Sequence, residues 1–399
     1  MKKINMANVP ISVVSRNILF VLLLIYFVQG VFYPVGSIVS QGVLIMYLFI
    51  SSNYLYRFFM AGEYNTFSWA LTVFLVMNVV YYVLGDSVVN GVHSILVLKK
   101  YVFFVLTFYS FYELAKNRLL TTRSLKVFSL LYILICVLQY VLGPSIDDMS
   151  ALEGGFVNNN SYLFVSLLPI VGLFMKNKKL YLSLYSVLIY FVILGSKRGA
   201  IIAFVFGSFS VFYYLLKEAE KKNKFRNVLF TVIVLVLVGY YAYSQYLKNY
   251  YLHDRIISAL DGNSSGRDII YYKIYNSWYN SSSVWNMLLG YGFNGSRRLT
   301  HMYAHNDWLE LLAGQGILGI FVYAFVFYGL IRFFVKSSRL MTGQEKSIYL
   351  SICGMWFAQS IYSMGYGGLF NYTYTLTVGY LMGDIYNRKK GYVGCLSKF

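Results

Sequence analysis

The chain has 399 residues, of which 58% are hydrophobic and only 12% are charged. Soluble globular proteins average about 45–50% apolar and about 25% charged residues. The composition excludes an ordinary soluble domain and predicts an all-α polytopic membrane protein. The net charge of +19 suggests a nucleic-acid partner at first sight. In a membrane protein, however, the distribution of cations among the loops is the first explanation to test.

Twelve apolar runs follow one another, each near the roughly 20 residues that a membrane-spanning helix needs. They are 17–34, 37–56, 67–84, 92–114, 125–142, 159–175, 179–195, 199–216, 227–244, 306–335, 347–364 and 369–387. Lys99 and Lys100 interrupt the fourth run, and the last two contain small residues that permit close helix contacts. The first run is long enough to span a membrane, and no small-residue cleavage pattern follows it, so we expect it to be a transmembrane helix and not a cleaved signal peptide. We predict one integral membrane domain, 1–399, with about twelve transmembrane helices.

Most of the 34 Lys and Arg residues fall on one side of the membrane if the N-terminus lies in the cytoplasm. Cytoplasmic segments of bacterial membrane proteins carry an excess of Lys and Arg, and here this pattern places both termini inside. It explains most of the net charge without nucleic acid. The exceptions gather on the outer face, in Lys99–Lys100, in the turn 195–199 and in the segment 245–305. The orientation of the chain in the membrane does not require these outer cations, so they indicate an anionic partner on that face.

The segment 245–305 is the one long stretch that does not span. About sixty residues is far longer than an ordinary connection, and such length usually marks function. Apolar residues recur at helical spacing in 268–279. We therefore predict an extracytoplasmic loop between the ninth and tenth transmembrane helices that contains short amphipathic helices.

Two other patterns carry no chemistry. The cysteines Cys136, Cys353 and Cys395 have neither metal-ligand spacing nor an even number, so we interpret them as packing residues. Residues 314–319 read G-Q-G-I-L-G, which imitates a dinucleotide-binding motif. That motif requires a preceding strand, whereas these glycines lie within an apolar helix. Close packing between helices is the better interpretation.

His305 stands where the polar segment meets the tenth apolar run. An imidazole titrates near neutral pH and can accept a proton from a hydroxyl group. Taken alone, an interfacial histidine bonded to a neighbour explains the residue as well. Asp307 and Glu310 lie close in sequence, and either could orient the ring. His301 is a candidate metal partner, but no set of Cys or carboxylate residues completes a site.

Arg198 and Arg267 are candidate anion-binding residues. A guanidinium group stays charged and binds phosphate through two hydrogen bonds. Arg198 lies between Lys197 and Gly199 at the start of an apolar run, where a helix N-terminus adds donors. Arg267 follows Ser-Ser-Gly, another helix-start signal. Contact with lipid headgroups is the alternative for each.

Four motifs in this order resemble the O-antigen polymerase and ligase superfamily: GSKRGA, SGRD, GYGFNG and HNDWLELLAGQGILG. The most specific is His-Asn, nine residues, Gly, two residues, Gly, complete from His305 to Gly319. GGFVNNNSYL, with Asn159 and Asn160, resembles a weaker motif. The resemblance covers roughly 150–335. Lys197 departs from the family pattern, where serine or arginine is commoner, and a second cation should strengthen phosphate binding.

The resemblance implies an integral enzyme of the bacterial inner membrane that transfers glycan from undecaprenyl diphosphate at the outer face. Transfer would proceed with inversion and without a metal or other cofactor. His305 would activate the acceptor hydroxyl, and Arg198, Arg267 and Lys197 would hold the diphosphate. Candidate glycan or supporting residues are Asn306, Asp307, Glu310, Asn159, Asn160, Arg297 and Arg298.

Among the functions that the resemblance allows, we favour a polymerase that joins lipid-linked repeat units into O-antigen or capsular polysaccharide, because such sequences are typically as rich in Tyr and Phe as this one. The sister ligase, which transfers glycan to a lipid A core, is the first alternative. A polysaccharide flippase is another, but it predicts charges deep within several spans and symmetric halves, which the sequence lacks. Expected partners are the lipid-linked glycan and membrane lipids, with a chain-length regulator and a flippase as further candidates.

Overall fold

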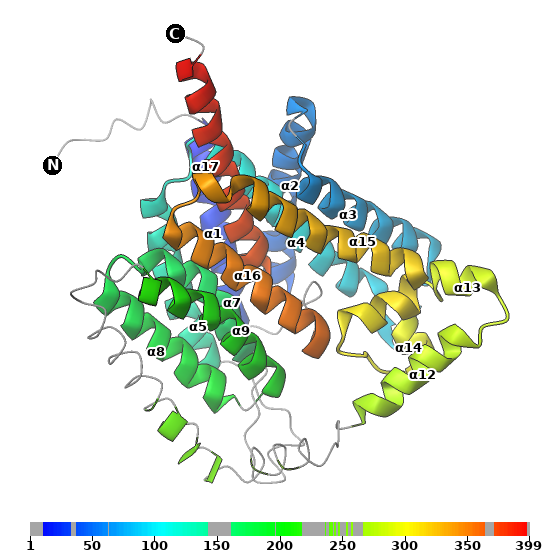
Figure 1. Ribbon diagram of the computed structural model, residues 1–399. Helices are drawn as coiled ribbons and strands as arrows, with labels where there is room; N and C mark the ends of the chain where they lie inside the picture. Colours follow the sequence, from blue (N-terminus) through cyan, green and yellow to red (C-terminus); the bar gives the residue numbers. More distant parts are fainter. Residues whose placement is uncertain are drawn as a thin grey trace.

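Figure 1 shows the computed structural model, which describes residues 11–32, 37–62, 64–142, 161–195, 197–217, 266–363 and 371–396, together with single positions between 236 and 257. Apart from one short hairpin, the described elements are helices. This confirms the expected all-α membrane class in its coarse form.

The helices coincide with the apolar runs that the sequence predicts, except for the run 227–244, which lies almost wholly outside the described residues. In chain order they are α1 (Ile11–Phe32), α2 (Ile38–Ala61), α3 (Thr66–Leu84), α4 (Ser94–Lys116), α5 (Thr122–Leu142), α7 (Ser161–Val171), α8 (Lys178–Leu194), α9 (Arg198–Lys217), α15 (Asp307–Ser337), α16 (Gly343–Tyr362) and α17 (Tyr372–Leu396). A 3₁₀ turn, Gly172–Phe174, continues α7, and another, Ser338–Leu340, follows α15.

Five of the described helical segments are long and apolar enough to cross a membrane. They are α2, α3, α4, α5 and the segment Asp307–Leu340, which is α15 with its 3₁₀ turn. Shorter apolar stretches occur in α1, α7 and α9. The chain is therefore a polytopic membrane protein by length and composition, and the full set of twelve spans stays a prediction.

Helix α4 lies at the centre of the helix assembly, with nearly all of its side chains buried from Tyr101 to Ala115. Its main partner is α17, and glycines of α17 bring the two backbones together. A Cβ on Gly379 would lie only 2.5 Å from the carbonyl oxygen of Phe108. The small residues of the last apolar run thus permit the close helix contact that the sequence predicts.

A two-stranded hairpin, β1 (Val88–Val89) and β2 (Val92–His93), connects α3 to α4 and was not predicted. The strands are antiparallel, with Val88 opposite His93. Asn90 and Gly91 both have positive φ angles, of 46° and 76°, as a two-residue type I′ turn requires. An Asn-Gly pair is the usual sequence signal for this turn, but the strands are too short to give a periodic pattern.

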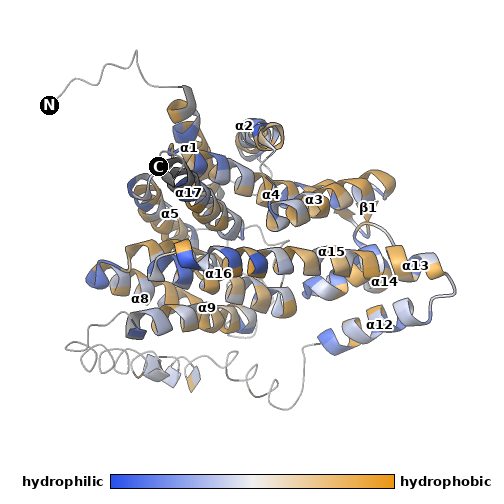
Figure 2. Cartoon of the chain, turned by 45° about the horizontal axis from the view of Figure 1, so that its top comes forward, coloured by the Kyte–Doolittle hydropathy of each residue, from blue (hydrophilic) through white to orange (hydrophobic). Residues whose placement is uncertain are grey.

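The long polar segment contains three helices, α12 (Arg267–Tyr279), α13 (Val284–Leu289) and α14 (Gly295–Thr300). All three gather beside the N-terminal end of α15 (Figure 1). The residues of α12 are more hydrophilic than those of α3 and α15, which are mainly hydrophobic (Figure 2). Short helices were expected in this segment, and they stand next to the start of the histidine-bearing motif.

Candidate active site

The N-terminal end of α15 fixes the position of His305. Asn306 caps the helix, because its side-chain oxygen accepts a hydrogen bond from the Leu309 amide at 3.1 Å. Its side-chain nitrogen donates to the carbonyl oxygen of Ile361, 3.0 Å away at the end of α16. One amide side chain therefore caps α15 and holds it to α16, and His305 is the residue immediately before it.

His305 has a strained backbone, with a φ angle of 53°. A left-handed conformation at a residue other than glycine costs on the order of 1–3 kcal/mol, and it persists only where the surroundings enforce it. Glu310 supplies that support, since its carboxylate accepts hydrogen bonds from the backbone amides of Ala304 and His305. The hydroxyl of Ser296 in α14 donates to the same carboxylate. Glu310 thus holds the backbone of the histidine in place.

Two cations act on the His305 ring. The ring is partly open to solvent, yet the surrounding protein desolvates it, and this burial lowers its pKa below the ordinary value of 6.5. The positive charges of Arg267 and Lys197 lower the pKa further. The imidazole is therefore neutral at neutral pH, which is the form that can accept a proton.

The C-terminal end of α16 brings the separate motifs together. Arg267, the first residue of α12, donates a hydrogen bond to the carbonyl oxygen of Tyr362 at 3.2 Å. Gly199 lies against the same carbonyl, because a Cβ there would be 2.9 Å from the Tyr362 oxygen. Since the Ile361 carbonyl already holds Asn306, the motifs that contain Arg198, Arg267 and His305 meet at two consecutive residues of α16.

Three helices begin at this meeting point: α9 at Arg198, α12 at Arg267 and α15 at Asp307. The first backbone N–H groups of a helix have no partner within the helix and carry partial positive charge. Together with the cationic side chains of Lys197, Arg198 and Arg267, these helix ends favour an anionic ligand such as a phosphate or diphosphate.

Tyr271 is a residue of this site that the sequence did not indicate. It lies one helical turn after Arg267 on α12, and its hydroxyl is hydrogen-bonded with the side chains of Arg267 and Asn306. Desolvation by burial raises its pKa, so the hydroxyl stays protonated and can donate. The spacing of four residues from Arg267 was the available signal, because it places both side chains on one helix face.

The glycine motifs on either side of His305 form a seam of close backbone contacts. The amides of Tyr291 and Gly292 donate to the carbonyls of Ala313 and Gly314, at 2.8 and 3.0 Å. Gly316 interrupts α15 with a φ of 62° and ψ of −154°, and a Cβ there would lie 2.5 Å from the Leu288 backbone. The glycines therefore serve packing, as the sequence suggested, and they also break the helix.

Asp307 is held in the core beside the start of α15. It is fully buried, and its carboxylate accepts a hydrogen bond of 2.6 Å from the Tyr323 hydroxyl. The indole nitrogen of Trp356 donates to that hydroxyl in turn, at 3.0 Å. Of the two carboxylates considered for orienting His305, Asp307 anchors α15 in the core and Glu310 contacts the backbone of the histidine. An orienting role for either carboxylate on the ring stays a prediction.

Arg297 and Arg298 of α14 contact the hairpin between α3 and α4. Arg297 donates to the carbonyl of Asn90 at 2.9 Å and lies over the Tyr303 ring. Arg298 forms a 2.7 Å ion pair with Asp86. These contacts hold the loop in place, and a role in glycan binding stays a prediction. Asn159 and Asn160 lie outside the described residues.

No group of three His, Cys, Asp or Glu side chains in the described ranges is arranged to hold a metal ion. Cys136 is buried and Cys353 partly buried, and both are free. The fold and site together define a polytopic helical membrane protein that carries a cationic site with a neutral histidine.

One stretch of the chain is similar to a known family. Residues 183–324 match the family model described as O-antigen ligase. The matched segment includes Lys197, Arg198, Arg267 and His305, and the match confirms the resemblance to the O-antigen polymerase and ligase superfamily. No curated protein matches the chain. The family indicates an enzyme of glycan polymerisation or ligation, and it does not separate the two.

Proposed function

We propose that the protein is a polysaccharide polymerase that joins undecaprenyl-diphosphate-linked repeat units into O-antigen or capsular polysaccharide. The observation that carries the proposal is the meeting of Arg267, Gly199 and Asn306 at the last two residues of α16. This meeting combines a neutral histidine with a cationic, helix-terminated anion site. Such a pair suits transfer of a sugar from a diphosphate to a hydroxyl group.

The chemistry is a single displacement at the anomeric carbon of the donor sugar. His305 accepts the proton of the acceptor hydroxyl as its oxygen forms the new glycosidic bond. The bond from the anomeric carbon to the diphosphate oxygen breaks, and the electron pair leaves with the lipid diphosphate. Attack opposite the leaving group inverts the anomeric configuration. The cations Arg198, Arg267 and Lys197 hold the diphosphate and stabilise its developing charge.

The membrane arrangement is part of the same proposal. The distribution of Lys and Arg supports an arrangement with both termini in the cytoplasm and the site at the outer face of the bacterial inner membrane. The lipid-linked donor would then enter from the bilayer, and the glycan would grow outside it. A chain-length regulator and a flippase are the partners that such a polymerase needs for chain control and for substrate supply.

The deciding experiment incubates the purified full-length protein with undecaprenyl-diphosphate-linked repeat units and separates the products by size. A ladder of longer lipid-linked glycans is expected. Product that appears only when lipid A core is added would replace the polymerase with the ligase, the alternative that the family description supports. Transport of the lipid-linked glycan across vesicles without any transfer would make the protein a flippase.

The role of His305 is tested best with His305→Asn. Asparagine tolerates the left-handed backbone that this position has, so the variant removes the base and keeps the local fold. Transfer should be lost while binding of the lipid diphosphate persists. In Arg267→Ala, binding should weaken instead. Lys179→Ala, an exposed cation at the start of α8, is the control and should change neither. Transfer by His305→Asn at the wild-type rate would remove the histidine from the mechanism.

A further inference from the structure

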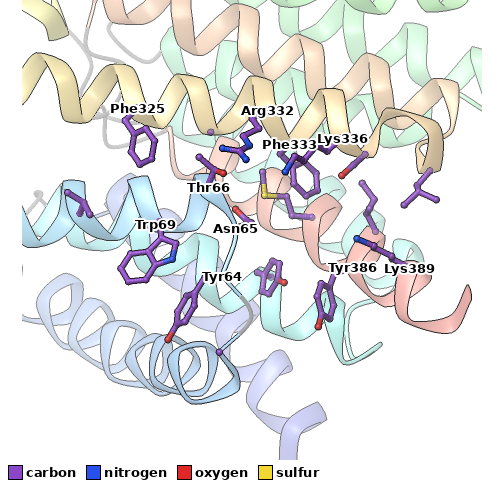
Figure 3. Close-up of a pocket in the computed structure, with 18 residues that line it drawn as sticks. Tyr64, Asn65, Thr66, Trp69, Phe325, Arg332, Phe333, Lys336, Tyr386 and Lys389 are labelled. Carbon is purple, nitrogen blue, oxygen red and sulfur yellow. The ribbon is translucent and has the colours of Figure 1, made fainter. Parts of the chain in front are cut away.

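A groove of about 990 Å³ lies at the opposite end of α15 from His305. It is formed by the start of α3, the last turns of α15 and the end of α17, with Tyr112 of α4 (Figure 3). Helix α15 has 31 residues, which at 1.5 Å per residue separates its two ends by on the order of 45 Å. The groove is therefore remote from the candidate active site and lies at the other membrane face.

Three cations line the groove: Arg332 and Lys336 from α15, and Lys389 from α17 (Figure 3). All three side chains are exposed, and none of the described residues that line the groove is acidic. Arg332 donates a long hydrogen bond of 3.4 Å to the hydroxyl of Tyr328, which is a neutral group. The groove thus concentrates positive charge.

Among the residues that the structure describes, the carboxylates of α16 and α17 nearest to Lys389 are already paired. Arg388, the neighbour of Lys389 on α17, forms ion pairs with Glu345 at 2.9 Å and with Asp384 at 3.1 Å. Glu345 and Asp384 thus pair with Arg388, and Glu113 of α4 pairs with Lys116 at 2.9 Å, so these described carboxylates are engaged away from the three groove cations. Positive charge beside a groove between transmembrane helices is the arrangement that binds acidic lipid headgroups.

The groove also has an apolar and aromatic lining, which includes Trp69 and Val73 of α3 and Phe325 of α15. Figure 3 shows Trp69 and Phe325 on this side. These side chains are 47%, 40% and 41% exposed, on helices that are long and apolar enough to cross a membrane. Close contact between α3 and α15 closes the groove at its floor, where a Cβ on Gly329 would lie 2.6 Å from the Phe67 Cα. A ligand must therefore combine an anionic head with an apolar chain.

We propose that this groove binds one acidic phospholipid, with its phosphate at Arg332, Lys336 and Lys389 and an acyl chain along Trp69, Val73 and Phe325. The site goes beyond the glycan-transfer reaction and does not depend on it. A headgroup alone would lack the apolar contacts, and a neutral lipid would lack the charge contacts. The positive-inside distribution places this end of α15 in the cytoplasmic leaflet.

The test measures binding of dioctanoyl phosphatidylglycerol to delipidated full-length protein in a nonionic detergent. Two further ligands separate the contributions: dioctanoyl phosphatidylcholine has the same chains without net charge, and glycerol phosphate has the anion without chains. Phosphatidylglycerol should bind at least tenfold more tightly than either. Equal binding of phosphatidylcholine, or of glycerol phosphate, would overturn the proposal.

The variant Arg332→Gln/Lys336→Gln/Lys389→Gln locates the site. Each cation near a membrane surface contributes about fivefold to the affinity for an acidic lipid, so the triple variant should weaken binding on the order of 100-fold. The matched control is Lys176→Gln/Lys178→Gln/Lys179→Gln, which removes the same charge from the exposed α7–α8 turn. That turn lies at the same end of the molecule, where Gln344 donates to the Gly172 carbonyl at 2.8 Å.

Binding should be unchanged within about twofold in the control triple variant. Equal losses of affinity in the two triple variants would show that general surface charge attracts the lipid, and would overturn the proposal that the groove binds it. An unchanged affinity in the groove variant would do the same. Because all six positions are exposed, both triple variants should fold, and an unfolding curve that matches the wild type checks this.

Discussion

Asn306 offers a quantitative test of how the candidate active site is held together. In Asn306→Ala, α15 loses its cap on the Leu309 amide, which costs about 1 kcal/mol. The hydrogen bond to the Ile361 carbonyl is also lost, which costs about another 1 kcal/mol. Together these two losses should lower the free energy of unfolding by at least about 2 kcal/mol, because Asn306 also contacts the Tyr271 hydroxyl.

The variant Asn306→Ser distinguishes the effects of these two contacts. A serine hydroxyl also caps a helix, but it is too short to reach Ile361, so the loss should be about 1 kcal/mol. Both variants release the start of α15 from the end of α16, and a shift of about 1 Å in a catalytic group costs on the order of 100-fold in rate. Glycan transfer should therefore fall in both. Asn177→Ala, which removes the cap of α8, should cost about 1 kcal/mol and leave transfer unchanged.

The assays are chemical denaturation in detergent micelles and single-turnover transfer from the lipid-linked donor. Equal destabilisation by the alanine and serine variants would refute the assigned cap. Wild-type transfer by Asn306→Ser would refute the idea that the contact with α16 positions His305. A loss of transfer in Asn177→Ala would show that helix stability in general, and not this contact, controls the rate.

Three further predictions concern charge, packing and hydrogen bonding. Burial and nearby cations keep the pKa of His305 low, so activity should fall only below that depressed pKa. Lys197→Gln removes one of these cations and should therefore move the acidic limb of the pH–rate profile to higher pH. An unmoved limb would show that the charge of Lys197 does not act on the histidine. Gly316→Ala should lower both the yield of folded protein and the rate of transfer, because the added Cβ would lie 2.5 Å from the Leu288 backbone at a position with positive φ. Wild-type behaviour on size-exclusion chromatography and in transfer would contradict the close packing at the seam. Tyr271→Phe should slow transfer with little loss of stability, and an unchanged rate would exclude the hydroxyl from the site.

The sequence predicted those features that hydrophobicity and motif spacing encode. The helices coincide with the apolar runs wherever the structure describes them, and the histidine and arginine motifs meet in space. It could not predict that α16 joins the motifs, because the contacts are made by the main-chain carbonyls of Ile361 and Tyr362. A residue of any type has such a carbonyl, so the contacts leave no signal in the sequence.

Two local features were beyond sequence reasoning for a different reason. The direction of a side chain near a helix start depends on the neighbours that surround it, so proximity in sequence suggested an orienting role for Asp307, whereas Tyr323 draws its carboxylate into the core. The break at Gly316 has no separate signal either, since glycine in an apolar run serves close packing and helix interruption equally well.

The seam between the loop and the break in α15 has a consequence for how the protein is made. Irregular backbone is tolerated at membrane depth only where protein groups satisfy its carbonyls. Here Tyr291 and Gly292 donate to Ala313 and Gly314. The donors precede the acceptors along the chain, so they leave the ribosome first and are available when the interrupted helix enters the bilayer. Exchanging the order of these two segments by circular permutation would expose two carbonyls to lipid during insertion.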